Sequence, residues 1–124
     1  MEAGIGLDLV EVRRIERLTR RWGRQFLDRI FTEGELASVL GKRKPAEHLA
    51  ARFAAKEALL KAANLLPCRR WREIEVRNRP SGEPYFSKLP EGLEPERVKL
   101  SLTHAAGVAV AIVLIESRGG EEQR

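Results

Sequence analysis

The segment from Pro45 to Asn64, PAEHLAARFAAKEALLKAAN, constrains the fold more than any other part of the chain. It is rich in strong helix formers and has no glycine, and its proline stands at the very start, so it predicts one long helix. Pro45 suits the first helical position and Asn64 suits the end. Leu49, Phe53 and Leu60 recur at helical spacing, so one side of this helix is expected to face a core.

The charged residues of the same helix allow two interpretations. Glu57 and Lys61 are four residues apart, and Arg52 and Lys56 are close by in the sequence. In the first interpretation the helix lies on the surface, and Glu57 and Lys61 form an ordinary pair worth about 0.2–0.5 kcal/mol. In the second, the carboxylate and its cations hold a metal ion beside a polyphosphate. Spacing alone favours the first interpretation.

Size and composition indicate one globular domain. The chain has 124 residues, of which 43% are hydrophobic and 33% charged, and this is enough for one domain with a modest core. The 23 Lys and Arg against 18 Asp and Glu give a formal charge of +5, which favours anionic partners without selecting one. The single cysteine, Cys68, excludes an intramolecular disulfide, and no Cys/His spacing suggests zinc.

Two features bear on location. The N-terminal residues lack the cationic and apolar regions of a signal peptide, and the longest apolar run, 108–115, is too short to span a bilayer. We therefore expect a cytoplasmic protein with no membrane partner.

Alternating residues predict a first strand over 3–10. In it, Asp8 lies on the opposite side from the large aliphatic residues Ile5, Leu7 and Leu9. Asp8 has two interpretations, because a helical pattern follows directly. It is either a strand-end or helix-capping carboxylate or a functional group.

Further elements follow along the chain. Residues 11–22 predict a helix, and Thr32 with Glu35 fits a capping box for a helix that ends before Gly41. A lone histidine at a strand end, here His104, is more often structural than catalytic. The remaining predictions are a hairpin over 73–79 and 84–88, strands over 99–104 and 108–116, and a disordered tail over 118–124.

The 11–22 helix carries an arginine-rich side, if it runs on through Gly23. Any amphipathic helix has a charged outer face, but six arginines with only Glu11 and Glu16 beside them exceed what solvation requires. The forked donors of arginine suit carboxylates and phosphates, so we interpret this side as a docking face for something acidic. The arginines are Arg13, Arg14, Arg17, Arg20, Arg21 and Arg24.

Three segments occur in a set order along the chain: GIGLDLVEVRRI at 4–15, RFAAKEALLKA at 52–62 and LSLTHAAGVAVAIV at 100–113. Together they resemble the bacterial holo-[acyl-carrier-protein] synthases, short-chain members of the 4′-phosphopantetheinyl transferase superfamily. The resemblance runs from about residue 3 to 116. It implies a single α+β domain over 1–117, with a mainly antiparallel sheet packed against the long central helix.

The resemblance also implies a reaction and partners. The family transfers the 4′-phosphopantetheine group of coenzyme A to a serine of apo acyl carrier protein, which supports fatty acid biosynthesis. Adenosine 3′,5′-bisphosphate is released, and Mg²⁺ is required. Family members form homotrimers with active sites at the subunit boundaries. The apolar last strand suits such an interface, although core burial explains it equally well.

When the family's functional residues are carried over to the matching positions of this sequence, the resemblance implies which residues form the site. The metal-binding acids are Asp8 and Glu57, a pairing that suits magnesium, and Lys61 serves the phosphate or leaving group. Either Glu57 or a metal-bound water takes the serine proton. The implied catalytic residues are Glu57, Lys61 and Asp8. The implied coenzyme contacts are Lys61, His104, Pro84, Arg52 and Lys56, and the implied carrier-protein dock is Arg13, Arg14, Arg17, Arg21 and Arg24.

Two departures and two alternatives accompany this assignment. Residues 64–72 lack the family's short Gly-rich turn, and Glu83 stands where a lysine is common, so no coenzyme contacts are assigned to 64–72. One alternative is a small basic nucleic-acid-binding protein, although paired acids would repel phosphates and the chain has no recognisable binding motif. The other is a carrier-binding module without catalysis, which the presence of Asp8, Glu57, Lys61 and His104 argues against.

Overall fold

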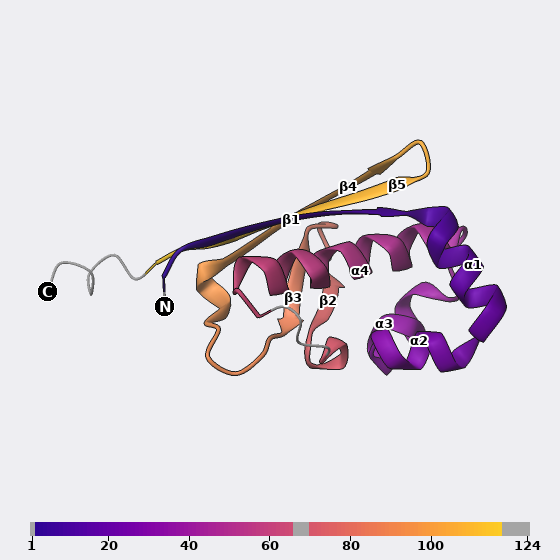
Figure 1. Ribbon diagram of the computed structural model, residues 1–124, viewed down its shortest axis with the longest axis horizontal. Coiled ribbons are helices and arrows are strands. Elements are labelled where there is room, and N and C mark those ends of the chain that lie inside the picture. Colours follow the sequence, from indigo (N-terminus) through magenta and orange to yellow (C-terminus); the bar gives the residue numbers. More distant parts are fainter. Residues whose placement is uncertain (1, 66–69, 118–124) are drawn as a thin grey trace, which may run out of the picture.

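The long helix α4 (Pro45–Ala62) runs through the middle of the molecule, and a three-stranded sheet covers one side of it (Figure 1). The computed structural model describes residues 2–65 and 70–117. The sheet is antiparallel throughout, in the order β1-β5-β4. The predicted α+β class is confirmed. The strands are β1 (Gly4–Glu11), β5 (Val108–Ile115) and β4 (Val98–Ala105).

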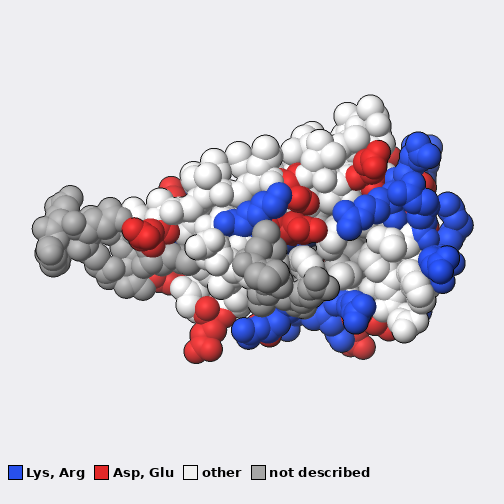
Figure 2. All heavy atoms as spheres, in the orientation of Figure 1, with Lys and Arg blue, Asp and Glu red and all other residues white. Residues whose placement is uncertain are grey.

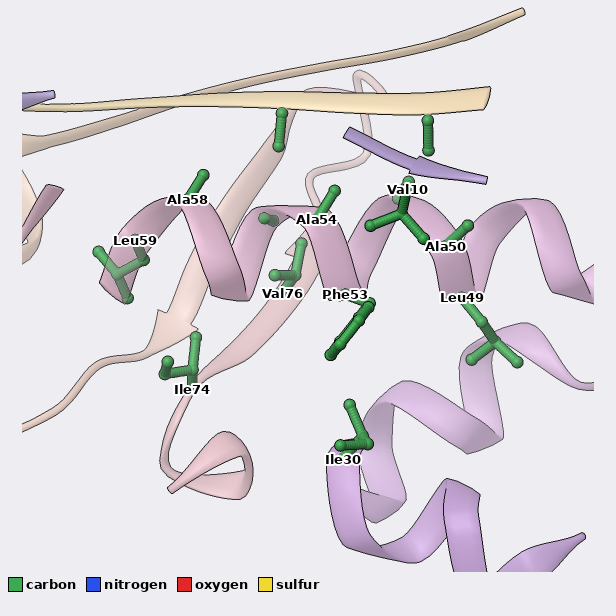
Figure 3. Close-up of a cluster of buried hydrophobic side chains, with 14 of the residues drawn as sticks. Val10, Ile30, Leu49, Ala50, Phe53, Ala54, Ala58, Leu59, Ile74 and Val76 are labelled. Carbon is green, nitrogen blue, oxygen red and sulfur yellow. The ribbon is translucent and has the colours of Figure 1, made fainter. Parts of the chain in front are cut away.

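Two glycines let β1 approach α4 closely. A Cβ atom on Gly6 would lie 1.9 Å from the carbonyl oxygen of Ala58, and one on Gly4 would lie 2.0 Å from that of Ala62. The side of α4 that faces the sheet is lined with small residues, among them Ala54 and Ala58, whose methyl groups point at the strands in Figure 3. This close packing brings the inward residues of β1 next to those of α4.

The other side of α4 is also covered. Helices α2 (Arg24–Ile30) and α3 (Glu33–Val39) and the hairpin β2 (Glu75–Asn78) to β3 (Pro84–Lys88) lie there, while α1 (Val12–Trp22) packs near the start of α4 (Figure 1). The predicted hairpin is confirmed. Short 3₁₀ turns, η1 (Trp71–Glu73) and η2 (Pro95–Arg97), precede β2 and β4.

This arrangement corrects the picture of α4 as a surface helix. Leu49, Phe53 and Leu60 are buried as predicted. However, buried residues such as Leu49, Ala54 and Leu59 point in several directions around the helix (Figure 3). Even Arg52 and Lys56 are buried. A helix with apolar neighbours on most sides is a core element, so the surface interpretation is wrong.

The ends of the helices follow local rules that the sequence carries. Asn64 adopts a positive φ of 59°, and the N–H groups of Leu65 and Asn64 donate to the carbonyls of Leu60 and Lys61 at 2.8 and 3.1 Å. These bonds form a Schellman motif and confirm the predicted stop at Asn64. The capping box of Thr32 and Glu35 is likewise present.

One helix boundary differs from the expectation. Helix α1 ends at Trp22, because Gly23 takes a φ of 55°, and a separate helix, α2, begins at Arg24. The arginine-rich side of α1 therefore does not continue through Gly23. The predicted disordered tail, 118–124, lies outside the described residues.

The outer face of the sheet is apolar and open. Ile5, Leu7 and Leu9 of β1 point away from α4 and are 65%, 58% and 60% exposed, and Ile112 and Leu114 of β5 lie beside them. Asp8 lies on the opposite side of β1 from Ile5, Leu7 and Leu9, as predicted. Within the described ranges, no helix is long and apolar enough to cross a membrane.

Candidate functional site

Asp8 and Lys61 meet at the free edge of β1. The Lys61 ammonium donates to Oδ1 of Asp8 at 3.0 Å and to the carbonyl oxygen of Leu7 at 2.9 Å. The Asp8 side chain is 14% exposed and that of Lys61 is 41% exposed. The residue that caps α1 is Glu11, so the helix-capping interpretation of Asp8 is wrong. The ion pair of Lys61 is thus a contact between helix and sheet.

Glu57 lies half-buried beside this pair. Burial raises the pKa of the Glu57 carboxyl, and the negative charge of Asp8 raises it further, while Arg14 and Lys61 act in the opposite direction. The fold has therefore brought two carboxylates together that are far apart in the sequence.

The donor set at this edge suits a hard dication. Two carboxylates and a backbone carbonyl are oxygen ligands of the kind magnesium takes, and magnesium usually completes its shell with phosphate and water. The described residues contain no cluster of three or more His, Cys, Asp or Glu side chains. The residue types of Asp8 and Glu57 would fit a magnesium site that is completed by ligands from outside the protein.

A second, cationic cluster lies at the opposite edge of the sheet. Burial lowers the pKa of His48, and Lys42, Arg52 and His104 lower it further, whereas Glu47 raises it, so each of these residues lies near His48. The Arg52 guanidinium donates to Oδ1 of Asn78 at 3.1 Å. Its buried Nε has no hydrogen-bond partner in the part of the chain that the structure describes. Such a cluster suits an anionic ligand.

Pro84 belongs to this second side. It begins β3, pairs with Asn78, and lines a groove of about 590 Å³ between β3 and β4. Arg79, whose guanidinium lies 4.2 Å from the centre of the Tyr85 ring, lines the same groove. The groove adds a cation and an aromatic ring beside the predicted proline.

The two clusters are separated within one copy of the chain. Asp8 is on β1 and His104 is on β4, which are the two edges of the sheet, with β5 between them. At about 100° per residue, His48 and Glu57 point about 180° apart around α4. Helix and sheet therefore stand between the carboxylates and the cationic cluster.

Comparisons with known proteins identify the superfamily of this chain. The sequence model of the 4′-phosphopantetheinyl transferase superfamily matches residues 4–113. The chain belongs to this superfamily. The resemblance predicted from the three segments is confirmed.

The relatives within the superfamily are close in sequence and fold. The holo-[acyl-carrier-protein] synthase of Chloroherpeton thalassium is 45% identical over 116 residues, which cover 90% of this chain and 96% of the relative. The crystal structure of the Neisseria meningitidis synthase has a TM-score of 0.82 at 34% identity, covering 92% and 98% of the two chains. The Bacillus anthracis synthase, in complex with CoA (3′,5′-ADP), has a TM-score of 0.79 at 37% identity, covering 93% and 96%.

Lys56, which the superfamily resemblance assigned to the coenzyme, has a different environment. Its side chain is 0% exposed, and its ammonium donates to Oε1 of Glu35 and to the carbonyl of Ile30, both at 2.7 Å, and to the carbonyl of Trp71 at 3.1 Å. With three oxygens around a sealed ammonium, Lys56 has no access to a ligand. Its assignment as a coenzyme contact is therefore wrong.

The predicted docking face is split between two directions. Arg13, Arg17 and Arg21 are exposed on α1, and Figure 2 shows Lys and Arg side chains gathered at this end of the molecule. Arg14 instead lies over the Phe53 ring, 5.6 Å from its centre, and acts on Glu57. Arg14 thus borders the carboxylate cluster, and Arg24 starts α2 with an ion pair to Asp28 at 3.0 Å.

Sequence reasoning missed His48. It lies four residues before Arg52, so the two share one side of the helix, and His48 lies near His104. The spacing of His48 and Arg52 was the available signal. Only the pairing of β4 against β5 adds His104 to them.

Proposed function

We propose that this chain transfers the 4′-phosphopantetheine group of coenzyme A to a serine of an apo acyl carrier protein, and that Asp8, Glu57 and Lys61 form the reacting centre. The reaction predicted from the sequence is confirmed by the relatives, which are holo-[acyl-carrier-protein] synthases over almost the whole chain. The observation that carries the assignment of the centre is the meeting of two carboxylates and one ammonium at the free edge of β1.

The residues of the centre divide the chemistry among them. Asp8 and Glu57 would hold the magnesium ion, which when bound neutralises charge on the pyrophosphate. Lys61 orients the phosphate that is attacked and stabilises its charge. The position of Glu57 beside Asp8 and Lys61 supports Glu57 as the acceptor of the serine proton.

The bonds change as follows. The serine oxygen of the carrier protein forms a bond to the phosphorus next to the pantetheine arm, while its proton passes to the Glu57 carboxylate. The bond from that phosphorus to the bridging oxygen breaks, and the electron pair stays on the released adenosine 3′,5′-bisphosphate. The in-line attack needs positioning and charge stabilisation rather than a covalent enzyme intermediate.

The cationic cluster takes the nucleotide end of coenzyme A. His104 and Arg52, together with His48, would face its phosphates, and Pro84 would lie beside it in the groove between β3 and β4. The unpartnered Nε of Arg52 supports this role, because a buried donor without an acceptor costs free energy until an anion arrives.

The complete site needs two copies of the chain, and we assign it to the subunit boundaries of a homotrimer. The carboxylates and the cationic cluster lie at opposite edges of one sheet, so an adjacent copy can bring its cluster to the Asp8 side. The open apolar face of Ile5, Leu7 and Leu9 supports association, because exposed patches of this kind mark interfaces.

The carrier protein docks on the arginines of α1 and α2, since an acidic helix complements exposed cations. Arg13, Arg17, Arg21 and Arg24 supply the outer face, and Arg14 stands between the dock and Glu57. The nucleic-acid alternative gains no support from a site whose two carboxylates repel phosphates. The cytoplasmic location stays a prediction.

The test is incubation with coenzyme A, magnesium and an apo carrier protein, followed by intact-mass measurement of the carrier. The wild-type chain should add one phosphopantetheine group. Asp8→Asn and Glu57→Gln should each lose about 100-fold or more in rate, equivalent to about 2.7 kcal/mol or more. Glu91→Gln removes an exposed carboxylate in a turn and should match the wild type. Normal transfer by both site variants would overturn the assignment.

A further inference from the structure

The Lys61 ammonium already occupies the cation position of the carboxylate cluster. It lies 3.0 Å from Oδ1 of Asp8 and 2.9 Å from the carbonyl oxygen of Leu7. These are two of the oxygens that a hard dication at this edge would use. A side chain expected to serve the phosphate is therefore engaged with Asp8 and the Leu7 carbonyl.

We propose that Lys61 is the resident counter-ion of the free site and that it competes with the divalent cation for Asp8. Metal binding and the transfer of Lys61 from Asp8 to the coenzyme phosphate then form one exchange. This inference rests on the proposed function, because it takes Asp8 as a metal ligand.

The environment of the two partners favours such an exchange. Asp8 is largely enclosed, with a 14% exposed side chain, whereas Lys61 is 41% exposed. The lysine can therefore leave on its flexible stem, while the carboxylate stays in place. The Leu7 carbonyl is available because β1 is an edge strand, with β5 on one side only.

Charge makes the two cations compete for Asp8. An ammonium and a dication on the same carboxylate would repel each other at contact distance. Lys61 also opposes the rise in the pKa of Glu57, so its charge acts on both acids. While it stays, the site is partly neutralised and attracts a metal ion less strongly.

The exchange couples the metal to coenzyme A. A bound pyrophosphate offers Lys61 a new anionic partner and so frees Asp8. By linkage, each ligand then raises the affinity of the other. The free protein should accordingly hold a dication weakly.

The test measures Mn²⁺ binding to the coenzyme-free protein, with the free-ion EPR signal as the readout. Lys61→Met removes the ammonium and keeps the unbranched stem of the side chain, and we expect it to tighten Mn²⁺ binding about tenfold. Lys88→Met removes the same charge from an exposed lysine on β3 and should stay within about twofold of the wild type. Thermal melting checks that each variant folds.

If the tighter Mn²⁺ binding of Lys61→Met acts through Asp8, the double variant Lys61→Met with Asp8→Asn should no longer show it. Unchanged or weaker binding by Lys61→Met, with Asp8→Asn still lowering the affinity of the wild type, would overturn the exchange and leave the metal assignment intact. If Asp8→Asn leaves the Mn²⁺ affinity unchanged both alone and together with Lys61→Met, both the exchange and the metal site would be overturned.

Discussion

At the scale of single residues, Glu57 works against the stability of the protein. Its pKa is raised from the ordinary 4.5 by burial and by Asp8, so the folded state holds the proton more tightly than the unfolded chain. Stability from this group is present at low pH and is lost as pH rises from about the unfolded value through the folded pKa. A cost of this kind is expected where a carboxylate is kept for function.

The thermal stability of Glu57→Gln tests whether the charged Glu57 carboxylate destabilises the folded state. In metal-free buffer the variant should melt at a higher temperature than the wild type at pH 7, because the amide carries no charge to desolvate. The difference should vanish below about pH 4, where the wild-type carboxyl is protonated. Differential scanning calorimetry across this range makes the comparison, and a variant that melts lower than the wild type at pH 7 would show the sign to be wrong.

Lys56 and Lys61 lie on either side of Glu57 in the sequence but should differ in how much stability their removal costs. Lys56→Met should destabilise the protein by about 3–5 kcal/mol, because it leaves the buried Glu35 charge unpaired. Lys61→Met should cost about 1 kcal/mol or less, since its pair with Asp8 is partly exposed. Urea unfolding measures both.

A second change makes the Lys56 result specific. Adding Glu35→Gln to Lys56→Met should recover part of the loss, because the amide is uncharged and its oxygen can still accept from one of the two backbone N–H groups, of Thr32 or Val76, that bond separate oxygens of Glu35. Equal losses for the two single lysine variants would contradict the assignment of their roles.

At the scale of elements, α1 and α2 form the proposed docking surface. Reversing Arg17 and Arg21 to Glu should raise the KM for the carrier protein about tenfold or more and reduce its salt dependence, because exposed charges steer encounter. The KM for coenzyme A should barely change, since both arginines are exposed on α1. Steady-state kinetics at two salt concentrations provides the readout, and equal losses for both substrates would argue against docking.

Local signals made most element boundaries predictable. Pro45, Asn64 and the pair Thr32–Glu35 act through their own backbone neighbours, so the sequence carries their effect directly. Gly23 was ambiguous, because a glycine within a helical pattern can be tolerated or can break it. The burial of α4 on most sides depends on elements distant in sequence, which its own pattern does not show.

The same distinction holds for the site. The resemblance of three segments predicted Asp8, Glu57 and Lys61, and the fold brings them together. Lys56 was misassigned because the sequence does not tell that Glu35 reaches it in the core. Likewise, sequence spacing could not show that His104 lies at the opposite sheet edge from Asp8.

At the scale of the whole molecule, the open sheet face should decide assembly. Leu7→Glu places a charge in the middle of the apolar patch, on a side chain that is 58% exposed in one copy. A single chain should tolerate it, but an interface that buries Leu7 should not. Light scattering should show a smaller species than the wild type, and transfer should fall with it. A variant that keeps both assembly and activity would place the interface elsewhere.

The most direct test of the account is complementation between two inactive copies. Asp8→Asn disables the carboxylate side, and His104→Glu puts a repelling charge in the cationic cluster; each alone should transfer phosphopantetheine poorly. When the two are co-expressed with different tags and purified through both tags, only mixed trimers remain, and about a third of their boundaries should pair an intact Asp8 side with an intact His104 side. Intact-mass measurement of the carrier protein should then show about a third of wild-type activity. Activity no higher than that of the separate variants would contradict a site shared between subunits.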